Sequence, residues 1–116
     1  MKVTGMDATY YTAKDLGALT TFYTGLLGAE PTMAGGPVAE WTFADGATFG
    51  LYGTAEGMPG GSAMFAVDDV AQAMADAKAR GVKFHDDEIT DTPGCHMAFG
   101  EDPEGNQFIL HHRKAQ

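Results

Sequence analysis

The chain has 116 residues, enough for one domain but not for a second independent fold. Its 44% hydrophobic and 20% charged residues are ordinary for a soluble globular protein, and no apolar run approaches the roughly 18 residues of a membrane helix. A formal net charge of −9 disfavours binding to nucleic acid and to anionic membranes, because such binding relies on Lys and Arg.

The N-terminal segment and the cysteine content predict a cytoplasmic protein. The segment MKVTGMDATYY contains one lysine but no apolar stretch with a cleavage site after it, so we expect no secretory signal. Cys95 is the only cysteine, which excludes an internal disulfide and suits a reducing compartment.

The first half of the sequence predicts a strand, then a helix, then extended segments. The first strand covers residues 6–13, and Asp15 caps a helix that ends at Gly28. Extended segments follow over residues 37–44 and 48–53. The helix is predicted from apolar residues spaced by three and four, namely Leu16, Leu19, Phe22, Tyr23, Leu26 and Leu27.

The second half begins after a connector over residues 54–61, which is rich in Gly and contains Pro59. A strand precedes a second helix, which begins after Asp69 and ends at Gly81. The strands of this half are predicted over residues 62–67, 82–88, 95–99 and 107–112.

The two halves form an internal repeat. Residues 45–51 and 104–110 each contain a turn with Gly, followed in register by Phe and Leu. Each half reads as strand, helix and three strands, with module boundaries of about 5–53 and 62–113 in a single domain over 1–116. Since about 50 residues bury too little apolar surface alone, we expect the modules to pack together. The predicted fold class is α+β.

Several short motifs in this order and spacing resemble the vicinal oxygen chelate superfamily, which contains glyoxalases, bleomycin-resistance proteins and extradiol dioxygenases. The resemblance covers nearly the whole chain and implies two βαβββ modules with curved mixed sheets around a cleft, usually in a homodimer. The motifs are Lys14-Asp15-Leu16, Phe22-Tyr23, Leu26-Leu27-Gly28, Val67-Asp68-Asp69-Val70 and Asp102-Pro103-Glu104-Gly105-Asn106.

The resemblance also indicates where metal-dependent members hold their ion. One ligand lies seven residues before the helix-starting Asp of each module, at Ala8 and Ser62 here, and another lies just before a Leu of each last strand, at Gly50 and Ile109. None of these four residues is a usual metal ligand, so we expect no metal and no cofactor. The repeat pairs the same positions, which supports the alignment.

A relocated metal site is an alternative, and it would use Asp7, Glu40, His96 and His111. Strand alternation argues against it, because Asp7 and Ala8 point to opposite faces, and the neighbouring residues His111 and His112 do as well.

The ligand-binding cleft is predicted from the same alternation. His96 and His111 are the best candidates for proton transfer, although a surface or core histidine is the plainer interpretation of His96. Only one of Glu40 and Trp41 can face inward, and Trp41 is either a stacking wall or core. The predicted lining consists of Tyr10, Thr12, Trp41, Thr48, Tyr52, Ser62, Met64, His96, Gln107 and His111.

The leading hypothesis is a metal-free protein that binds a small organic molecule, as bleomycin-resistance proteins do, and so sequesters a drug or metabolite or confers antibiotic resistance. The alternative is a glyoxalase- or dioxygenase-like enzyme, a lyase or an oxidoreductase, with a displaced divalent-metal site. A third hypothesis is a silent dimer. In each case we expect a homodimer without nucleic-acid or membrane partners.

Overall fold

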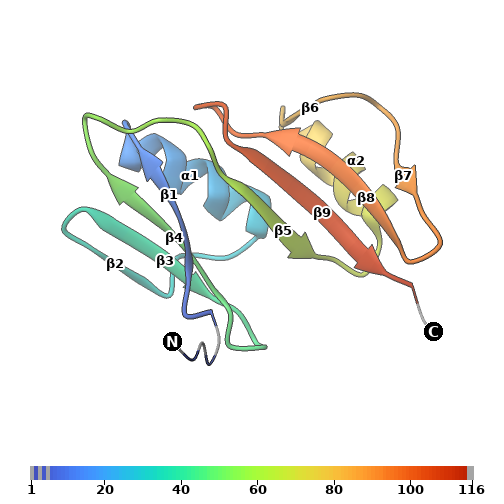
Figure 1. Ribbon diagram of the computed structural model, residues 1–116. Helices are drawn as coiled ribbons and strands as arrows, with labels where there is room; N and C mark the ends of the chain where they lie inside the picture. Colours follow the sequence, from blue (N-terminus) through green and yellow to red (C-terminus); the bar gives the residue numbers. More distant parts are fainter. Residues whose placement is uncertain (1, 3, 5, 115–116) are drawn as a thin grey trace. The chain divides into compact units, whose positions relative to one another are not determined.

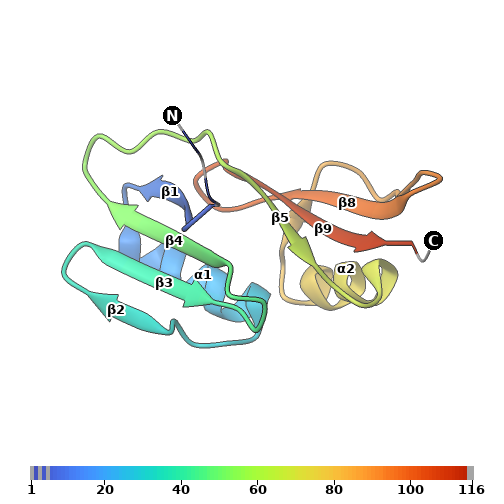
Figure 2. The same ribbon diagram turned by 60° about the horizontal axis from the view of Figure 1, so that its bottom comes forward.

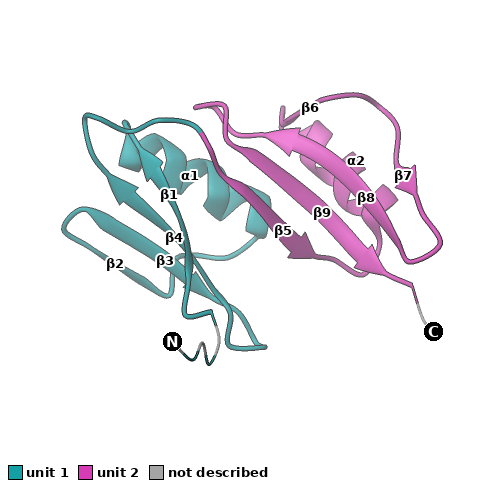
Figure 3. Ribbon diagram, viewed as in Figure 1, with its two compact units in different colours: residues 1–59 teal, residues 60–116 magenta. Residues whose placement is uncertain are grey.

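The chain folds as two units, and each unit is a helix laid on one face of a mixed β-sheet (Figure 1). The computed structural model describes residues 2, 4 and 6–114. The units comprise residues 1–59 and 60–116 and are coloured separately in Figure 3; we call them module 1 and module 2. The predicted α+β class is confirmed, and the division falls inside the predicted connector.

Module 1 has a four-stranded sheet in the order β1-β4-β3-β2. The edge strand β1 runs parallel to its neighbour β4, and the other neighbouring strands are antiparallel. The elements are β1 (Thr9–Ala13), α1 (Leu16–Leu27), β2 (Met33–Gly35), β3 (Val38–Thr42) and β4 (Thr48–Gly53).

Module 2 repeats this topology with the order β5-β9-β8-β6, and the short β7 also pairs with β8. Again the first and last strands, β5 and β9, run parallel. The elements are β5 (Ser62–Ala66), α2 (Val70–Ala79), β6 (Lys83–Phe84), β7 (Thr90–Asp91), β8 (Cys95–Glu101) and β9 (Gln107–Arg113).

The helix boundaries match their prediction. The side chains of Asp15 and Asp69 accept hydrogen bonds from the backbone N–H groups of Ala18 and Gln72, each at 3.0 Å. These bonds satisfy amides that the first helical turn leaves unpaired. Gly28, with φ of 69°, ends α1 in the left-handed conformation that glycine adopts most readily.

Several strands differ in length from their prediction. The first strand begins at Thr9 instead of residue 6, and the segment 82–88 contributes only Lys83–Phe84 to the sheet. The acidic residues after it form a turn, in which the Asp86 carboxylate accepts a hydrogen bond from the Glu88 N–H at 2.8 Å. The strands β2 and β7 were not predicted because three and two residues are too few to show alternation.

Module 1 has an aromatic core between α1 and its sheet. Tyr23 from α1 is fully buried, and its ring centroid lies 4.8 Å from that of Phe49 on β4 and 6.3 Å from that of Trp41 on β3. Tyr11 on β1 meets Phe49 edge to face at 5.0 Å. Figure 2 shows α1 on one side of this sheet only.

Module 2 has a smaller, mostly aliphatic core on the face that α2 covers. Phe108 on β9 is fully buried, and Phe84 meets it edge to face at 5.8 Å. Gly100 on β8 makes room for the Phe108 ring, because a Cβ there would lie 2.5 Å from its Cζ atom. This core also contains the buried apolar residues Phe65, Val70, Met74, Ala77, Ala98 and Leu110.

The registers of the two sheets coincide. Tyr10 pairs with Gly50 in module 1, and Met64 pairs with Ile109 in module 2. Tyr10 and Met64 each lie five residues before the Asp that caps the following helix. The helix caps and the turns therefore give the same corresponding residues in the two modules. The alignment of the two halves is therefore confirmed by backbone pairing.

A buried polar cluster fixes the turn between β8 and β9. Asn106 is 1% exposed, and its Nδ2 donates to the Asp102 carboxylate at 2.9 Å. Its Oδ1 accepts hydrogen bonds from the backbone N–H groups of Gly60 and Gly61 at 2.9 and 3.1 Å. Asn106 thus attaches the start of module 2 to the last turn of the same module.

We predict that Asn106→Ala destabilises module 2 by at least about 2 kcal/mol, since each buried polar group left unsatisfied costs about 1–3 kcal/mol. Urea unfolding should show this loss. The matched control is Pro103→Ala in the same turn, where the side chain is exposed and the change should stay within about 0.5 kcal/mol. Equal stabilities of the two variants would contradict the assignment.

Candidate functional site

Each sheet has an open face, by which we mean the side turned away from the helix of its own module. The core residues of β4, Phe49 and Leu51, alternate with residues that point the other way. In module 1 the open face carries Tyr10, Thr12, Met33, Val38, Glu40, Thr42, Thr48, Gly50 and Tyr52.

The centre of this face is a row formed by Tyr10, Gly50 and Glu40 on the adjacent strands β1, β4 and β3. The Tyr10 ring lies over Gly50, where a Cβ would come within 2.6–2.9 Å of three ring atoms. The Tyr10 hydroxyl then donates a hydrogen bond to Oε2 of Glu40, two strands away. Only glycine at the middle position permits this contact.

The carboxylate changes the acidity of the phenol. The hydrogen bond to Glu40, followed by partial burial and by the charge of Glu40, raises the pKa of Tyr10 from 10.0 to about 12. A carboxylate that accepts the phenol proton favours the protonated form. Tyr10 is therefore a hydrogen-bond donor at neutral pH and not a base.

The other predicted lining residues of module 1 differ in whether their hydroxyl groups already form hydrogen bonds. Tyr52 is 46% exposed, and its hydroxyl has no hydrogen-bond partner within the described residues. Thr48 shares a hydrogen bond of 2.9 Å with Thr42. The Thr12 hydroxyl is bound at 3.1 Å to the carbonyl and at 3.0 Å to the N–H of Met58. Thr12 thus holds the connector against β1.

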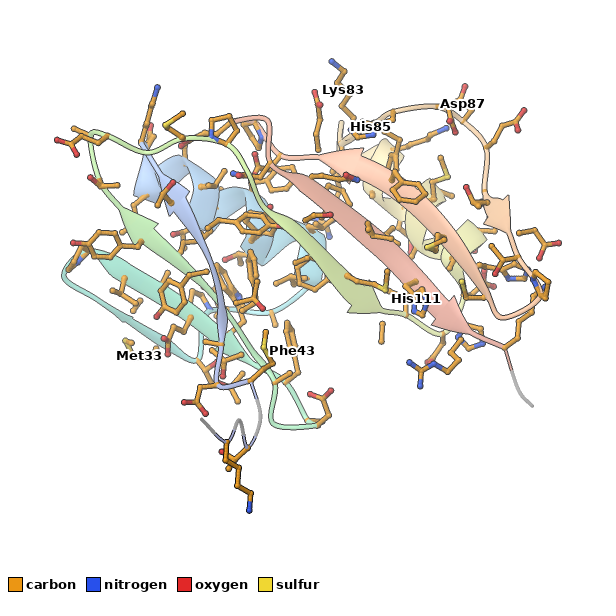
Figure 4. The ribbon with its side chains drawn as sticks, viewed as in Figure 1. Met33, Phe43, Lys83, His85, Asp87 and His111 are labelled. Atoms are coloured by element: carbon orange, nitrogen blue, oxygen red, sulfur yellow. The ribbon has the colours of Figure 1, made fainter. Side chains whose placement is uncertain are left out.

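The open face of module 2 is mostly apolar. The row equivalent to Tyr10, Gly50 and Glu40 consists of Met64, Ile109 and Phe99. Beside it, His111 lies between Ala66 and Met97, and its half-buried ring has no hydrogen bond or ion pair with any described residue (Figure 4). Ser62, paired with Gln107, completes the predicted residues of this face.

His96 does not lie on this face, which corrects its predicted position. It pairs with His112 on the side of the sheet that α2 covers, whereas its neighbour Met97 pairs with His111. The His96 Nε2 lies 3.2 Å from the carboxylate of Asp91. Lys114 first, and His96 to a smaller extent, hold the pKa of Asp91 below its usual value. His96 therefore belongs to a polar surface cluster with Asp91 and Lys114.

Trp41 is also corrected, because it belongs to the core and not to a ligand surface. Its side chain is 2% exposed and lies on the α1 side of the sheet. The indole Nε1 donates a hydrogen bond to the Ala29 carbonyl at 2.9 Å. Glu40 is consequently the residue of this strand that faces away from the helix.

A second charged group lies at the edge of module 2 near β6 (Figure 4). The Glu101 carboxylate lies 3.1 Å from Lys83 and 3.6 Å from His85. Lys78 binds Asp87 and holds the pKa of that carboxyl below its usual value. The basic partners and Asp87 are exposed while Glu101 is half-buried, and ion pairs near the surface contribute little stability.

The four positions that the resemblance assigns to metal ligands do not fit a divalent ion. The space above Gly50 holds the Tyr10 ring, and Ile109 is an apolar side chain that is 8% exposed. Ala8 precedes β1 and has no donor atom, and Ser62 supplies only a hydroxyl. A divalent ion in a protein takes His, carboxylate or thiolate donors, which are missing from all four positions.

The relocated donor set is not assembled either. His96 and His111 lie on opposite faces of their sheet, and Asp7 precedes β1. Over residues 2, 4 and 6–114, no three His, Cys, Asp or Glu side chains come close enough to hold a metal ion.

The prediction missed Met97 and Phe99 on the open face of module 2. The signal was present in the sequence, because antiparallel pairing across the turn at Gly105 places Phe99 opposite Ile109 and Met97 opposite His111. Glu40 was missed as well, because the predicted lining included Trp41 and only one of these two neighbours can face away from the helix.

The Tyr10 assignment predicts a titration. In the intact protein the pKa of Tyr10 should be about 12, and Glu40→Gln should lower it towards 10.0. Because the folded-state value is raised, the stabilisation by this group is complete below about pH 10 and is lost as the pH rises through about 12. NMR of 13Cζ-labelled tyrosine measures the value, with Tyr52→Phe as the control. An unshifted Tyr10 would refute the contact.

Two glycine substitutions should differ in their cost to stability, because one glycine lies under an exposed ring and the other under a buried ring. Gly50→Ala displaces the ring of Tyr10, which is 42% exposed and can move into solvent, so the loss of stability should stay below about 1 kcal/mol while the pKa of Tyr10 falls. Gly100→Ala meets the fully buried Phe108 ring and should cost about 1–3 kcal/mol. Equal costs in urea unfolding would contradict this difference.

Comparison with known proteins identifies a family and several solved structures with the same fold. Residues 5–110 match the model of the Glyoxalase/Bleomycin resistance protein/Dioxygenase superfamily. A glyoxalase/bleomycin resistance protein from Catenulispora acidiphila is 24% identical with a TM-score of 0.74, over 89% of this chain and 93% of that one. No curated protein matches.

Two further solved structures share the fold. A glyoxalase/bleomycin resistance protein from Albidiferax ferrireducens is 20% identical with a TM-score of 0.78, over 94% of this chain and 98% of that one. The oxidase ChaP-H2 is 20% identical with a TM-score of 0.71, over 97% and 96% of the two chains. At these identities the likeness concerns the fold alone.

Proposed function

Since the chain belongs to the Glyoxalase/Bleomycin resistance protein/Dioxygenase superfamily, we propose that it is a member that binds a small organic molecule on the open face of a sheet and uses none of the family's metal positions. The observation that carries this proposal is the Tyr10 ring above Gly50. A carboxylate ligand at position 50 and the ring in this place are mutually exclusive.

The composition of the open faces supports binding of an organic molecule. Tyr10, Tyr52 and Met64 are 42%, 46% and 52% exposed, although large hydrophobic side chains are usually buried. Small-molecule sites combine such apolar and aromatic area with a few directed polar groups. Glu40 and His111 are polar groups of this kind, one on each face.

Methionine and tyrosine suit this role for different reasons. Met64 and Met97 have flexible, polarizable side chains that adapt to irregular ligand shapes. The tyrosine rings offer a flat apolar surface with a hydroxyl at its edge.

We propose sequestration of a drug or metabolite as the biological outcome, in a cytoplasmic homodimer. No helix among the described residues could span a membrane.

Ligand binding should appear as a rise in thermal stability. A ligand at about 100 times its Kd adds roughly 2.7 kcal/mol to the free energy of unfolding. Thermal-shift screening of antibiotics, aldehydes and aromatic metabolites should therefore give hits, and Tyr52→Ala should weaken them. The control is Met58→Ala, since Met58 is 75% exposed on the connector. If no compound stabilises the protein, or if both variants weaken binding equally, the proposal fails.

The second candidate function is a lyase or an oxidoreductase with a displaced divalent-metal site. The observation that favours it is the His111 imidazole, which points to the open face with no partner among the described residues. We expect elemental analysis of protein purified without chelator to find less than about 0.1 divalent ion per chain, since structural and catalytic sites retain nearly one. A stoichiometric ion lost in His111→Ala but retained in His85→Ala would favour the enzyme.

A further inference from the structure

We propose that Glu40 is the anchor for a cationic nitrogen of the ligand, such as an ammonium group, and that the rings of Tyr10 and Tyr52 form its walls. This inference rests on the proposed function and names the class of ligand for the open face of module 1. Four observations carry it: the oxygen of Glu40 that no described donor reaches, the absence of a cation beside it among the described residues, the apolar equivalent row in module 2, and the two exposed rings.

Glu40 has unused capacity to accept hydrogen bonds. Oε2 accepts the Tyr10 hydroxyl, and within the described residues no donor reaches Oε1. An ionised carboxylate can accept about four hydrogen bonds over its two oxygens. The bond from Tyr10 fixes the orientation of the carboxylate, so a ligand donor meets a group that is already positioned.

No cation of the described chain neutralises Glu40. The carboxylates of Asp87, Asp91 and Glu101 in module 2 are all paired with lysine. In residues 1–59 the basic side chains are Lys2 and Lys14, and neither forms an ion pair with Glu40. The net charge of −9 further favours the approach of a cation over that of an anion.

The fold does not require a carboxylate at this position. Module 2 has the same strand order and register, and its equivalent row of Met64, Ile109 and Phe99 has no charged group. A sheet of this design is therefore stable with Phe where module 1 has Glu40. Since an apolar side chain would serve the packing, the carboxylate points to recognition.

The aromatic rings complete the site. Tyr52 lies two residues after Gly50 on the same face, so its Cα is about 6.7 Å further along the strand. Tyr10 covers Gly50 itself. A cation within about 6 Å of an aromatic face gains roughly 0.5–2 kcal/mol, and a charge-assisted hydrogen bond to Glu40 adds to this attraction.

Three probes that share a phenyl ring test the charge preference: phenethylammonium, the neutral 2-phenylethanol and the anionic phenylacetate. We expect NMR titration of the 15N-labelled full chain to show shifts at Gly50 and Tyr52 with phenethylammonium, with a Kd at least about tenfold below that of the alcohol. Phenylacetate should bind most weakly. The preference should decrease at high salt, because part of it is electrostatic.

Matched variants assign the effect to Glu40. Glu40→Gln should reduce the affinity for phenethylammonium to that for the alcohol, whereas Glu56→Gln, which removes the same charge at an exposed connector position, should leave it unchanged. Tyr52→Ala should weaken the binding of phenethylammonium, and Tyr52→Phe should retain it. The amide spectrum of each variant shows directly whether it is folded.

The outcomes separate this inference from the proposed function. Equal affinities for phenethylammonium and 2-phenylethanol, or an unchanged Kd in Glu40→Gln, would overturn the cation anchor while small-molecule binding stands. Binding of none of the three probes would also overturn the anchor, and the thermal-shift screen then decides the proposed function by itself. Retained binding in Glu40→Gln with loss in Glu56→Gln would place the charge effect elsewhere.

Discussion

Each sheet is covered by a helix on one face only, and this constraint determines which residues can form a site. Because side chains alternate along a strand, packing of α1 on Phe49 and Leu51 sends Gly50 and Tyr52 to the other side. The same constraint in module 2 separates Phe108 and Leu110 from Ile109 and His111. The core therefore selects the open face, and a shift of one residue in any strand would exchange the two.

The two modules are alike where they pack and different where they face away from their helices. Phe49 and Leu51 correspond to Phe108 and Leu110, and all four are buried. On the open faces, in contrast, Glu40 corresponds to Phe99 and Tyr10 to Met64. Folding accounts for the conserved pattern between the modules but not for the difference. The difference gives each open face its own chemistry, which is charged and aromatic in module 1 and apolar in module 2.

The repeat, the helix caps and the strand alternation made much of the fold predictable. Asp15 caps the start of α1 and Gly28 ends it, as predicted. Six residues of the predicted lining lie on the open faces, namely Tyr10, Tyr52, Ser62, Met64, Gln107 and His111. The short strands β2 and β7 were not predicted, because they depend on pairing with a neighbouring strand and show no local sequence pattern. His96 and Trp41 were misplaced for a related reason, since their faces follow from cross-strand register.

The contact between Tyr10 and Glu40 could not be predicted from spacing. Glu40 is 30 residues from Tyr10 in the chain, and the two meet only because β4 lies between their strands and carries glycine at the crossing point. Glycine in a strand interior is unfavourable by about 0.5–1 kcal/mol, so its place at position 50 needs a reason in the structure. The Tyr10 ring supplies that reason.

This contact also bears on the metal position that the family resemblance assigns to Gly50. A glutamate at position 50 would require the volume that the Tyr10 ring fills, so a metal ligand there and the hydrogen bond to Glu40 exclude each other. The carboxylate of this face lies one strand away, on β3 instead of β4, and it is bound by a phenol whose raised pKa keeps it protonated. A carboxylate held in this way is suited to accept hydrogen bonds from a ligand.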